Sequence, residues 1–392
     1  MMNVTIQPKR LHGSVTPPPS KSRAHRVLIA AMLAGEKLDL TGMGDSQDIE
    51  ATARCLRTLG ESGEELPLLD CGESGSTLRF LIPLALALRG GGRFVGRGRL
   101  MERPQEPYEK LFRSKDIFWE QKDGVLTVRG RLAPGVYEIA GDVSSQFITG
   151  LLYALPLLEG ESTLSLTTRL ESRDYVSMTL EVLGDCGIQV YETEGTFRIP
   201  GGQRYAPERP LTVEADWSGA AFWYAARLLG SAVDVQGMDL RSAQGDLRIV
   251  RFSEQLSRPG DVEIDVSQCP DLVPPLAAMG AVRHGVCRLT HAARLRMKES
   301  DRLEAVSSVL NALGAQVEEG EDSLTITGQA SLSGGESDCR NDHRIAMMAA
   351  IAATRCRGPV VLHGAECVKK SYPHFWEEYQ RLGGDLHVVI SG

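Results

Sequence analysis

The chain has 392 residues, enough for two domains with separate hydrophobic cores, and 42% of them are hydrophobic and 24% charged, as in an ordinary globular protein. The net charge of −8 argues against nucleic acid as the main partner, because proteins that bind phosphate backbones usually carry a basic face. No run approaches the roughly 20 apolar residues of a membrane span, so we expect no membrane partner.

The cysteines and the first residues suggest a compartment. Eight cysteines are scattered without CxxC pairs or metal-ligand clusters, and the opening segment MMNVTIQPKR alternates like a strand, without the apolar core of a signal peptide. We therefore expect a cytoplasmic protein with free, buried thiols and no bound metal.

Six runs of small apolar residues predict six buried helices. Each run follows a polar cluster rich in Ser, Asp or Asn, the residues that cap helix starts, and each ends at a glycine. In chain order the runs cover residues 25–35, 77–90, 146–160, 219–230, 272–285 and 343–358.

A β-rich stretch follows each closing glycine, and a more amphipathic helix then follows most of these stretches. The β-rich stretches are residues 37–43, 93–98, 162–170, 231–238, 286–295 and 359–368. The clearest second helices are residues 48–60, 174–184, 301–314 and 372–383. Three copies add a hairpin, over residues 117–130, 188–201 and 315–328.

These elements predict an α/β protein of two lobes, with three strand–helix–strand–helix–hairpin repeats in each lobe. The first repeat is trimmed, because the segment after Gly60 is too short for a hairpin. We expect an N-terminal lobe of residues 20–214 and a C-terminal lobe of residues 215–392, which residues 1–19 complete with the N-terminal strand.

Lysine and arginine stand repeatedly beside the helix starts. A helix start presents unpaired N–H groups and the positive end of the dipole, and therefore favours anions. The cations concerned are Lys21, Arg26, Arg79, Arg103, Lys298, Arg302, Arg344 and Lys370. Taken singly, Ser20-Lys21-Ser22 and Asp271 can be simple caps, and residues 298–302 a solvated helix start. Caps explain the serines but not the recurring cations, so a pocket for a ligand with several negative charges is the better interpretation.

The motifs also match a family in their order along nearly the whole chain. They are Ser20-Lys21-Ser22 with Arg26, Ser74-Gly75-Ser76 with Arg79, Glu102-Arg103-Pro104, Ser144-Ser145-Gln146, Lys298-Glu299-Ser300-Asp301-Arg302, Asn341-Asp342-His343-Arg344 and Lys370-Ser371-Tyr372-Pro373. Together they resemble the 5-enolpyruvylshikimate-3-phosphate (EPSP) synthases. The resemblance implies the two-lobed enolpyruvyl transferase fold with six βαβαββ-type repeats and an active site in the cleft between the lobes.

The resemblance also implies the activity. Enzymes of this family transfer the enolpyruvyl (carboxyvinyl) group of phosphoenolpyruvate to the 5-hydroxyl of shikimate-3-phosphate and release phosphate, a step of the shikimate pathway to aromatic amino acids. The reaction adds and then eliminates through a tetrahedral intermediate, and needs no metal or organic cofactor. We therefore expect a monomer whose partners are small anionic substrates, and inhibition by glyphosate.

Site residues follow from the same resemblance. The catalytic residues would be Lys21, Asp271 and Glu299. Shikimate-3-phosphate would be bound by Lys21, Ser22, Arg26, Ser144, Ser145, Gln146, Ser172, Tyr175, Asp271 and Lys298. Phosphoenolpyruvate would be bound by Lys21, Gly75, Arg103, Gln146, Arg302, Arg344 and Lys370.

Four residues depart from the common family pattern, and two rival functions stay open. The departures are Glu73-Ser74, Phe80 in place of a frequent proline, and Arg294 in place of an asparagine. One rival is an enolpyruvyl transferase acting on UDP-N-acetylglucosamine, although Ser22 replaces its asparagine and no cysteine lies near Arg103. The other is a non-catalytic binding protein of the same fold.

Overall fold

The computed structural model describes residues 2–36, 42–61, 63 and 65–390, and divides them between two compact units. The N-terminal unit spans residues 21–213, and the C-terminal unit combines residues 1–20 with residues 214–392. Each unit has its own core of buried apolar side chains. No helix among the described residues is long and apolar enough to cross a membrane.

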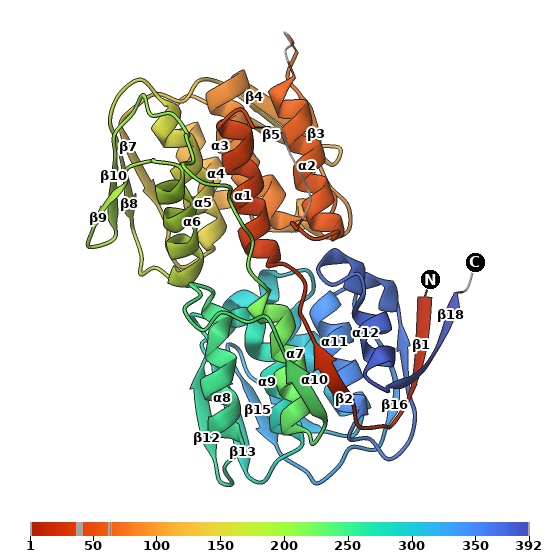
Figure 1. The fold of residues 1–392 in the computed structure, drawn as a ribbon. Helices are drawn as coiled ribbons and strands as arrows, with labels where there is room; N and C mark the ends of the chain where they lie inside the picture. Colours follow the sequence, from red (N-terminus) through yellow and green to blue (C-terminus); the bar gives the residue numbers. More distant parts are fainter. Residues whose placement is uncertain (1, 37–41, 62, 64, 391–392) are drawn as a thin grey trace. The chain divides into compact units, whose positions relative to one another are not determined.

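The N-terminal unit combines helices with two four-stranded sheets (Figure 1). Its α-helices are α1 (Lys21–Leu33), α2 (Gln47–Gly60), α3 (Gly75–Arg89), α4 (Glu106–Arg113), α5 (Ser145–Ala154) and α6 (Arg173–Asp185), with the short 3-10 helices η1 (Leu100–Glu102) and η2 (Leu155–Leu157). One sheet has the order β3-β4-β6-β5, formed by Leu68–Asp70, Gly91–Val95, Val125–Arg129 and Phe118–Lys122. The other has the order β7-β8-β10-β9, formed by Val136–Ile139, Ser162–Leu166, Thr196–Ile199 and Tyr191–Thr193.

The C-terminal unit repeats this arrangement. Its α-helices are α7 (Trp217–Leu228), α8 (Ile249–Leu256), α9 (Val273–Ala281), α10 (Arg302–Ala312), α11 (His343–Ala353) and α12 (Phe375–Arg381). Its 3-10 helices are η3 (Gly245–Arg248), η4 (Pro270–Leu272), η5 (Ala293–Met297) and η6 (Ala365–Lys370). One sheet has the order β12-β13-β15-β14, formed by Val262–Asp265, Val286–Thr290, Leu324–Thr327 and Gln316–Glu319. A parallel pair joins β2 (His12–Val15) to β11 (Ala232–Val235).

The first strand of the chain completes a sheet built by its last residues. Strand β1 (Met2–Gln7) lies between β17 (Val360–His363) and β18 (Asp385–Ile390), and β16 (Gly335–Asp338) pairs with the other side of β17. Val4 of β1 stands opposite Leu362 and Val388. In all four of the four-stranded sheets, one parallel pair is followed by two antiparallel pairings.

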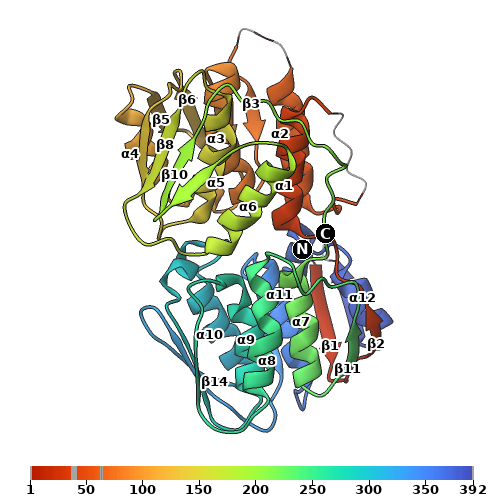
Figure 2. The same cartoon turned by 60° about the vertical axis from the view of Figure 1, so that its left-hand side comes forward.

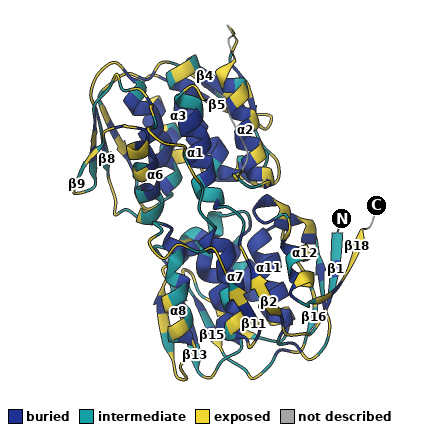
Figure 3. Ribbon diagram, in the orientation of Figure 1, coloured by how far each residue is buried: buried dark blue, intermediate teal, exposed yellow. Residues whose placement is uncertain are grey.

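The predicted buried helices are confirmed, and they occupy the core of each unit. Every residue of α9 and α11 is buried, and α7, α9 and α11 lie side by side (Figures 2 and 3). In the N-terminal unit α3 packs on α5 in the same way. Side-chain caps are present at α3, α5, α7 and α11, where Ser74, Ser144, Asp216 and Asp342 accept hydrogen bonds from the first turn.

The three predicted hairpins are also confirmed, as β5–β6, β9–β10 and β14–β15. Several predicted elements are shorter than expected. Helix α5 ends at Ala154, before the 3-10 turn that contains Pro156, and the stretch after β13 turns into η5. The strand predicted over residues 37–43 falls mostly outside the described residues, and the described residues between Gly60 and β3 contain no strand.

Candidate functional site

In the N-terminal unit the start of α1 carries Lys21 beside an acidic partner. Lys21 Nζ lies 2.7 Å from Oδ2 of Asp48, which belongs to the first turn of α2. The two side chains are 16% and 10% exposed, so the pair is largely shielded from water. Sequence reasoning missed Asp48, and the only signal was an acidic residue in a first turn, which is common at helix starts.

Arg26 connects α1 to α6. Its guanidinium donates to the backbone oxygens of Ser22 at 2.6 Å and Tyr175 at 2.9 Å, and to Oγ1 of Thr179 at 2.8 Å. Burial lowers the pKa of Arg26 to about 10, which still leaves it charged at neutral pH. The structure therefore brings together three residues predicted for the shikimate-3-phosphate site, Ser22, Arg26 and Tyr175.

The start of α3 meets the guanidinium of Arg103. A Cβ on Gly75 would lie 2.7 Å from a terminal nitrogen of Arg103, so only glycine leaves room for this side chain. Arg103 is 7% exposed, and Nε is buried without a hydrogen-bond partner among the described residues. A buried donor of a charged group without a partner is costly, which favours an anion at this position.

Arg79 and Gln146 hold the surroundings of Gly75. Arg79 donates to Oε1 of Gln146 at 2.8 Å and to the backbone oxygen of Pro104 at 2.9 Å. Nε2 of Gln146 donates to Oγ of Ser76 at 3.0 Å. These bonds tie α3, α5 and the segment after η1 to one another.

The serines at the starts of α5 and α6 differ in their geometry. Ser144 caps α5 by accepting from the backbone N–H of Gln146, and Ser145 follows it as a buried residue. Ser172 precedes α6 with a φ of 54°, in the left-handed region of backbone conformation that residues other than glycine rarely adopt. Six other described non-glycine residues share a positive φ, among them Asp123 and Glu194 in hairpin turns, so this conformation does not by itself assign a role to Ser172.

In the C-terminal unit Arg302 is the centre of an ionic network. Its side chain is 1% exposed and contacts Oδ1 of Asp271 at 2.7 Å, Oε2 of Glu299 at 2.8 Å and Oδ2 of Asp342 at 2.8 Å. The three carboxylates overcome the effect of burial and raise the pKa of Arg302 above its usual range. The network joins both predicted catalytic carboxylates, Asp271 and Glu299, to one cation.

Asp271 does not cap its helix. The start of α9 has no side-chain cap, and Asp271 instead contacts Lys298 at 3.5 Å and Arg344 at 3.2 Å in addition to Arg302. Burial alone would raise the pKa of Asp271, but Arg344, Lys298 and Arg302 together hold it well below its usual range. Asp271 is therefore ionised at neutral pH.

Lys298 has a pKa that lies close to neutral pH. Burial lowers its pKa to about 8, and Arg302 adds to this effect, although the carboxylate of Asp271 opposes it. Its side chain as a whole is 25% exposed. A lysine of this kind changes its charge near neutral pH and responds strongly to an added anion.

Of the remaining predicted cations, Arg344 lies in the first turn of α11 and Lys370 at the end of η6. Arg344 donates to Oγ of Ser218 at 3.1 Å, and its backbone N–H donates to Asp342. Lys370, at the end of η6, donates to the backbone oxygen of Asn341 at 2.6 Å and is 4% exposed. Arg294 donates to the backbone oxygen of Ser267, so this departure from the family pattern has a structural contact.

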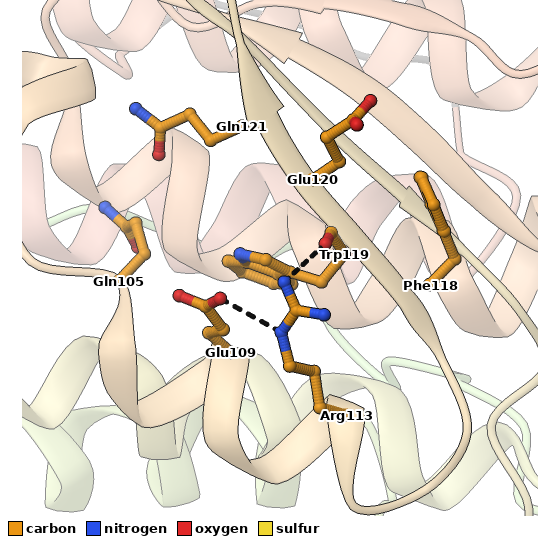
Figure 4. Close-up of a pocket in the computed structure, with 7 residues that line it drawn as sticks. All are labelled: Gln105, Glu109, Arg113, Phe118, Trp119, Glu120 and Gln121. Atoms are coloured by element: carbon orange, nitrogen blue, oxygen red, sulfur yellow. Dashed lines mark hydrogen bonds and ion pairs between the residues drawn. The ribbon is translucent and has the colours of Figure 1, made fainter.

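A separate hollow of about 490 Å³ lies on the N-terminal unit between α4 and β5 (Figure 4). It is lined by Gln105, Glu109, Arg113, Phe118, Trp119, Glu120 and Gln121. None of the predicted site residues lines it, and an ion pair between Glu109 and Arg113 crosses its floor. The hollow is therefore not part of the candidate site.

Solved structures share the fold of the whole chain. An EPSP synthase from Acinetobacter baumannii superposes with a TM-score of 0.79 at 24% identity, and covers 100% of both chains. The enolpyruvyl transferase NikO from Streptomyces tendae superposes with a TM-score of 0.76 at 17% identity, covering 100% of this chain and 99% of its own. The predicted fold class, that of the enolpyruvyl transferases, is thereby confirmed.

Sequence comparison narrows the class to one family. The family model described as EPSP synthase (3-phosphoshikimate 1-carboxyvinyltransferase) matches residues 5–379. The 3-phosphoshikimate 1-carboxyvinyltransferases of Clostridium kluyveri and Clostridium acetobutylicum are 45% and 40% identical, and each alignment covers 98% of both chains. The chain belongs to the EPSP synthase family, and the predicted function, enolpyruvyl transfer in the shikimate pathway, is confirmed at the level of this family.

Proposed function

We propose that this chain transfers the enolpyruvyl group of phosphoenolpyruvate to the 5-hydroxyl of shikimate-3-phosphate, with Lys21, Asp271 and Glu299 as the catalytic residues. The observation that carries the proposal is the network around Arg302, which joins Asp271 to Glu299 within one buried cluster. A non-catalytic binding protein has no need to bury two carboxylates on one guanidinium, since buried ion pairs contribute little to stability.

The chemistry needs an acid and a base in both the addition and the elimination. Glu299 would exchange a proton with the methylene carbon of phosphoenolpyruvate, and Asp271 would accept a hydrogen bond and then the proton of the 5-hydroxyl. In the elimination Glu299 would take a proton back from the new methyl group of the tetrahedral adduct, and Asp271 would give its proton to the departing phosphate. Positioned groups of this kind contribute about 10²–10⁴ in rate.

The low pKa of Asp271 makes it a weak base as long as phosphoenolpyruvate is not bound. A carboxylate neutralised by several cations is a weak base, and a general base works best when its pKa lies near the working pH. Arg302 and Arg344, which neutralise Asp271, are also the cations proposed to bind phosphoenolpyruvate. Binding of that substrate would draw positive charge from Asp271 and raise its pKa, so Asp271 would become a stronger base only in the loaded site.

The cations divide into two sets, which supports a site shared between the units. Lys21, Arg26 and Arg103 belong to residues 21–213, whereas Lys298, Arg302, Arg344 and Lys370 belong to the other unit. Each substrate carries a carboxylate and a phosphate, so each needs several of these cations. We propose that the site is completed in a cleft between the two units, and that binding of both substrates draws the units together.

The proposed residues divide between the substrates as the family pattern implies. Shikimate-3-phosphate would be held by Lys21, Ser22, Arg26, Ser144, Ser145, Gln146, Ser172, Tyr175, Asp271 and Lys298. Phosphoenolpyruvate would be held by Lys21, Gly75, Arg103, Gln146, Arg302, Arg344 and Lys370. The guanidinium of Arg103 beside Gly75, whose buried Nε has no hydrogen-bond partner among the described residues, is the feature that most favours this second set.

Phosphate release tests the assignment. The purified chain should release phosphate from phosphoenolpyruvate when shikimate-3-phosphate is added, without added metal and in the presence of a chelator. UDP-N-acetylglucosamine should not replace the acceptor. Activity with the nucleotide sugar alone would transfer the proposal to the rival transferase, and no turnover with either acceptor, despite binding of both substrates, would favour the binding protein.

We also propose that the chain acts as a monomer in the cytoplasm. All eight cysteines are free and buried, which suits a reducing compartment.

A further inference from the structure

A buried chain of hydrogen bonds runs from α1 to Ser74, the residue that caps α3. Nδ1 of His25 lies 2.7 Å from Oγ1 of Thr52, which lies 2.6 Å from Oγ1 of Thr77. Thr77 in turn donates to Oγ of Ser74 at 2.7 Å. None of the four side chains is more than 1% exposed.

The hydrogen bonds that link these four side chains all run in one direction, from His25 to Ser74. Each threonine hydroxyl has a single proton, and that of Thr77 is used on Ser74. Thr52 must therefore donate to Thr77, and His25 must donate from Nδ1 to Thr52. Burial, together with the charges of Lys21 and Arg26, lowers the pKa of His25 well below its usual range, so the imidazole is neutral and carries its proton on Nδ1.

The chain ends at the cap of α3. Oγ of Ser74 accepts both the hydroxyl of Thr77 and its backbone N–H, the latter at 3.2 Å. The next residue is Gly75, whose missing side chain leaves the space that Arg103 occupies. At its other end, His25 stands one turn after Lys21 on α1. The polar chain thus connects the segments that present Lys21 and Gly75.

Core packing alone does not require this arrangement. Valine has nearly the shape of threonine, and apolar side chains at all the positions of the polar chain would fill the same space without any polar group to satisfy. Nε2 of His25 is buried without a hydrogen-bond partner among the described residues, but Nδ1 and the three hydroxyls are paired with one another. Paired hydroxyls fix one arrangement of the groups they join, whereas apolar contacts tolerate small shifts. The three helices that it joins are α1, α2 and α3.

We propose that His25, Thr52 and Thr77 are positioning residues for the phosphoenolpyruvate subsite, because their hydrogen bonds hold the Gly75 backbone in register with Lys21. The inference rests on the proposed function, in which Gly75 and Arg103 bind that substrate. None of the three residues needs to contact substrate.

The test compares Thr52→Val with Thr52→Ser. Valine keeps the shape but removes both hydrogen bonds, so KM for phosphoenolpyruvate should rise about fivefold or more, the equivalent of one ordinary hydrogen bond. KM for shikimate-3-phosphate should change by less than about twofold, since Arg26 and its partners are untouched. Thr52→Ser, which keeps the hydroxyl, should restore the wild-type value. Thr77→Val breaks the same chain one link later, and gives the same readout if Thr52→Val does not fold.

Two further variants distinguish a positioning role from a general loss of stability and from an error in the proposed phosphoenolpyruvate subsite. Thr354 is also buried and donates to the backbone oxygen of Ile351 at 2.7 Å, but it belongs to the other unit, so Thr354→Val should lower stability without changing either KM. Arg103→Ala tests the subsite itself. The positioning role is wrong if Arg103→Ala raises KM for phosphoenolpyruvate but Thr52→Val and Thr77→Val do not. It is also wrong if the two valine variants raise the KM values of both substrates equally. If Arg103→Ala has no effect on this KM, the proposed subsite is wrong.

Discussion

The guanidinium of Arg103 lies against the position that a Cβ on Gly75 would occupy. One of its terminal nitrogens, Nη1, is 2.7 Å from that position and Cζ is 2.9 Å from it. Arg103 is buried, and its Nε has no hydrogen-bond partner among the described residues. Since the contact is with the far end of a flexible side chain, a methyl group at residue 75 would displace Arg103 and leave the fold intact.

Gly75→Ala should therefore impair binding and not stability. Alanine is the better helix former, by about 1 kcal/mol, so the unfolding midpoint should stay the same or rise. KM for phosphoenolpyruvate should rise about tenfold, because the displaced Arg103 loses a charge-assisted hydrogen bond to the substrate. Glyphosate is longer than phosphoenolpyruvate and should be weakened more, as the ratio of its inhibition constant to this KM will show.

Gly184→Ala is the matched control. Gly184 is also helical, in α6, and a Cβ there would meet no atom within 4 Å, so neither constant should change. Equal losses of both ligands in Gly75→Ala would mean that the extra length of glyphosate does not lie against residue 75.

Glu299→Gln separates chemistry from binding. Glutamine keeps an oxygen that can accept from Arg302, as Oε2 of Glu299 does at 2.8 Å, but it cannot exchange a proton. Turnover should fall by about 10²-fold or more, while calorimetry shows nearly unchanged affinity for shikimate-3-phosphate. Glu304→Gln, which changes an exposed ion pair with Arg340, should do neither. A loss of shikimate-3-phosphate affinity that accounts for the whole effect would assign Glu299 to binding.

The sequence predicted the elements of this fold because their signals are local. The apolar runs of α9 and α11 predict buried helices wherever the rest of the chain lies, and the turn at Asp123-Gly124 predicts the hairpin β5–β6. The ends were less predictable, since Pro156 stops α5 as an α-helix before the expected glycine.

The candidate site was predictable as a set of residue types, and its internal contacts were not. The recurrence of cations beside helix starts pointed to Arg302 and Arg344, but nothing local showed that Asp271 binds both of them and does not cap α9. Asp48 and Thr52 were missed for the same reason. Their partners stand on other helices, and such contacts depend on how the helices pack.

Asp342→Asn should destabilise the C-terminal unit. Asp342 is fully buried, accepts from Nε of Arg302 and Oγ of Ser300, and caps α11 through the N–H of Arg344. Asparagine would leave the buried guanidinium short of one charge, at a cost of about 3–5 kcal/mol in the free energy of unfolding. Urea denaturation should show this loss, whereas Asp338→Asn, at an exposed carboxylate, should cost less than about 1 kcal/mol.

Lys298 should set the alkaline limit of shikimate-3-phosphate binding. With a pKa of about 8 in the free protein, its amine is charged below pH 8 and neutral above it, so affinity for the anionic substrate should fall as the pH rises beyond 8, by up to about tenfold per unit. The same pKa lies below that of an unfolded lysine, about 10.4, so the unfolded chain binds more protons in this interval and the contribution of Lys298 to stability rises with pH.

Calorimetric titration from pH 6.5 to 9.5 measures the fall in substrate affinity, and urea denaturation over the same range measures the rise in stability. Lys298→Arg keeps its charge and should remove the loss of affinity above pH 8, while Lys122→Gln, at an exposed site on β5, should leave the profile unchanged. A wild-type profile that stays flat to pH 9.5 would show that Lys298 does not hold the substrate's charge.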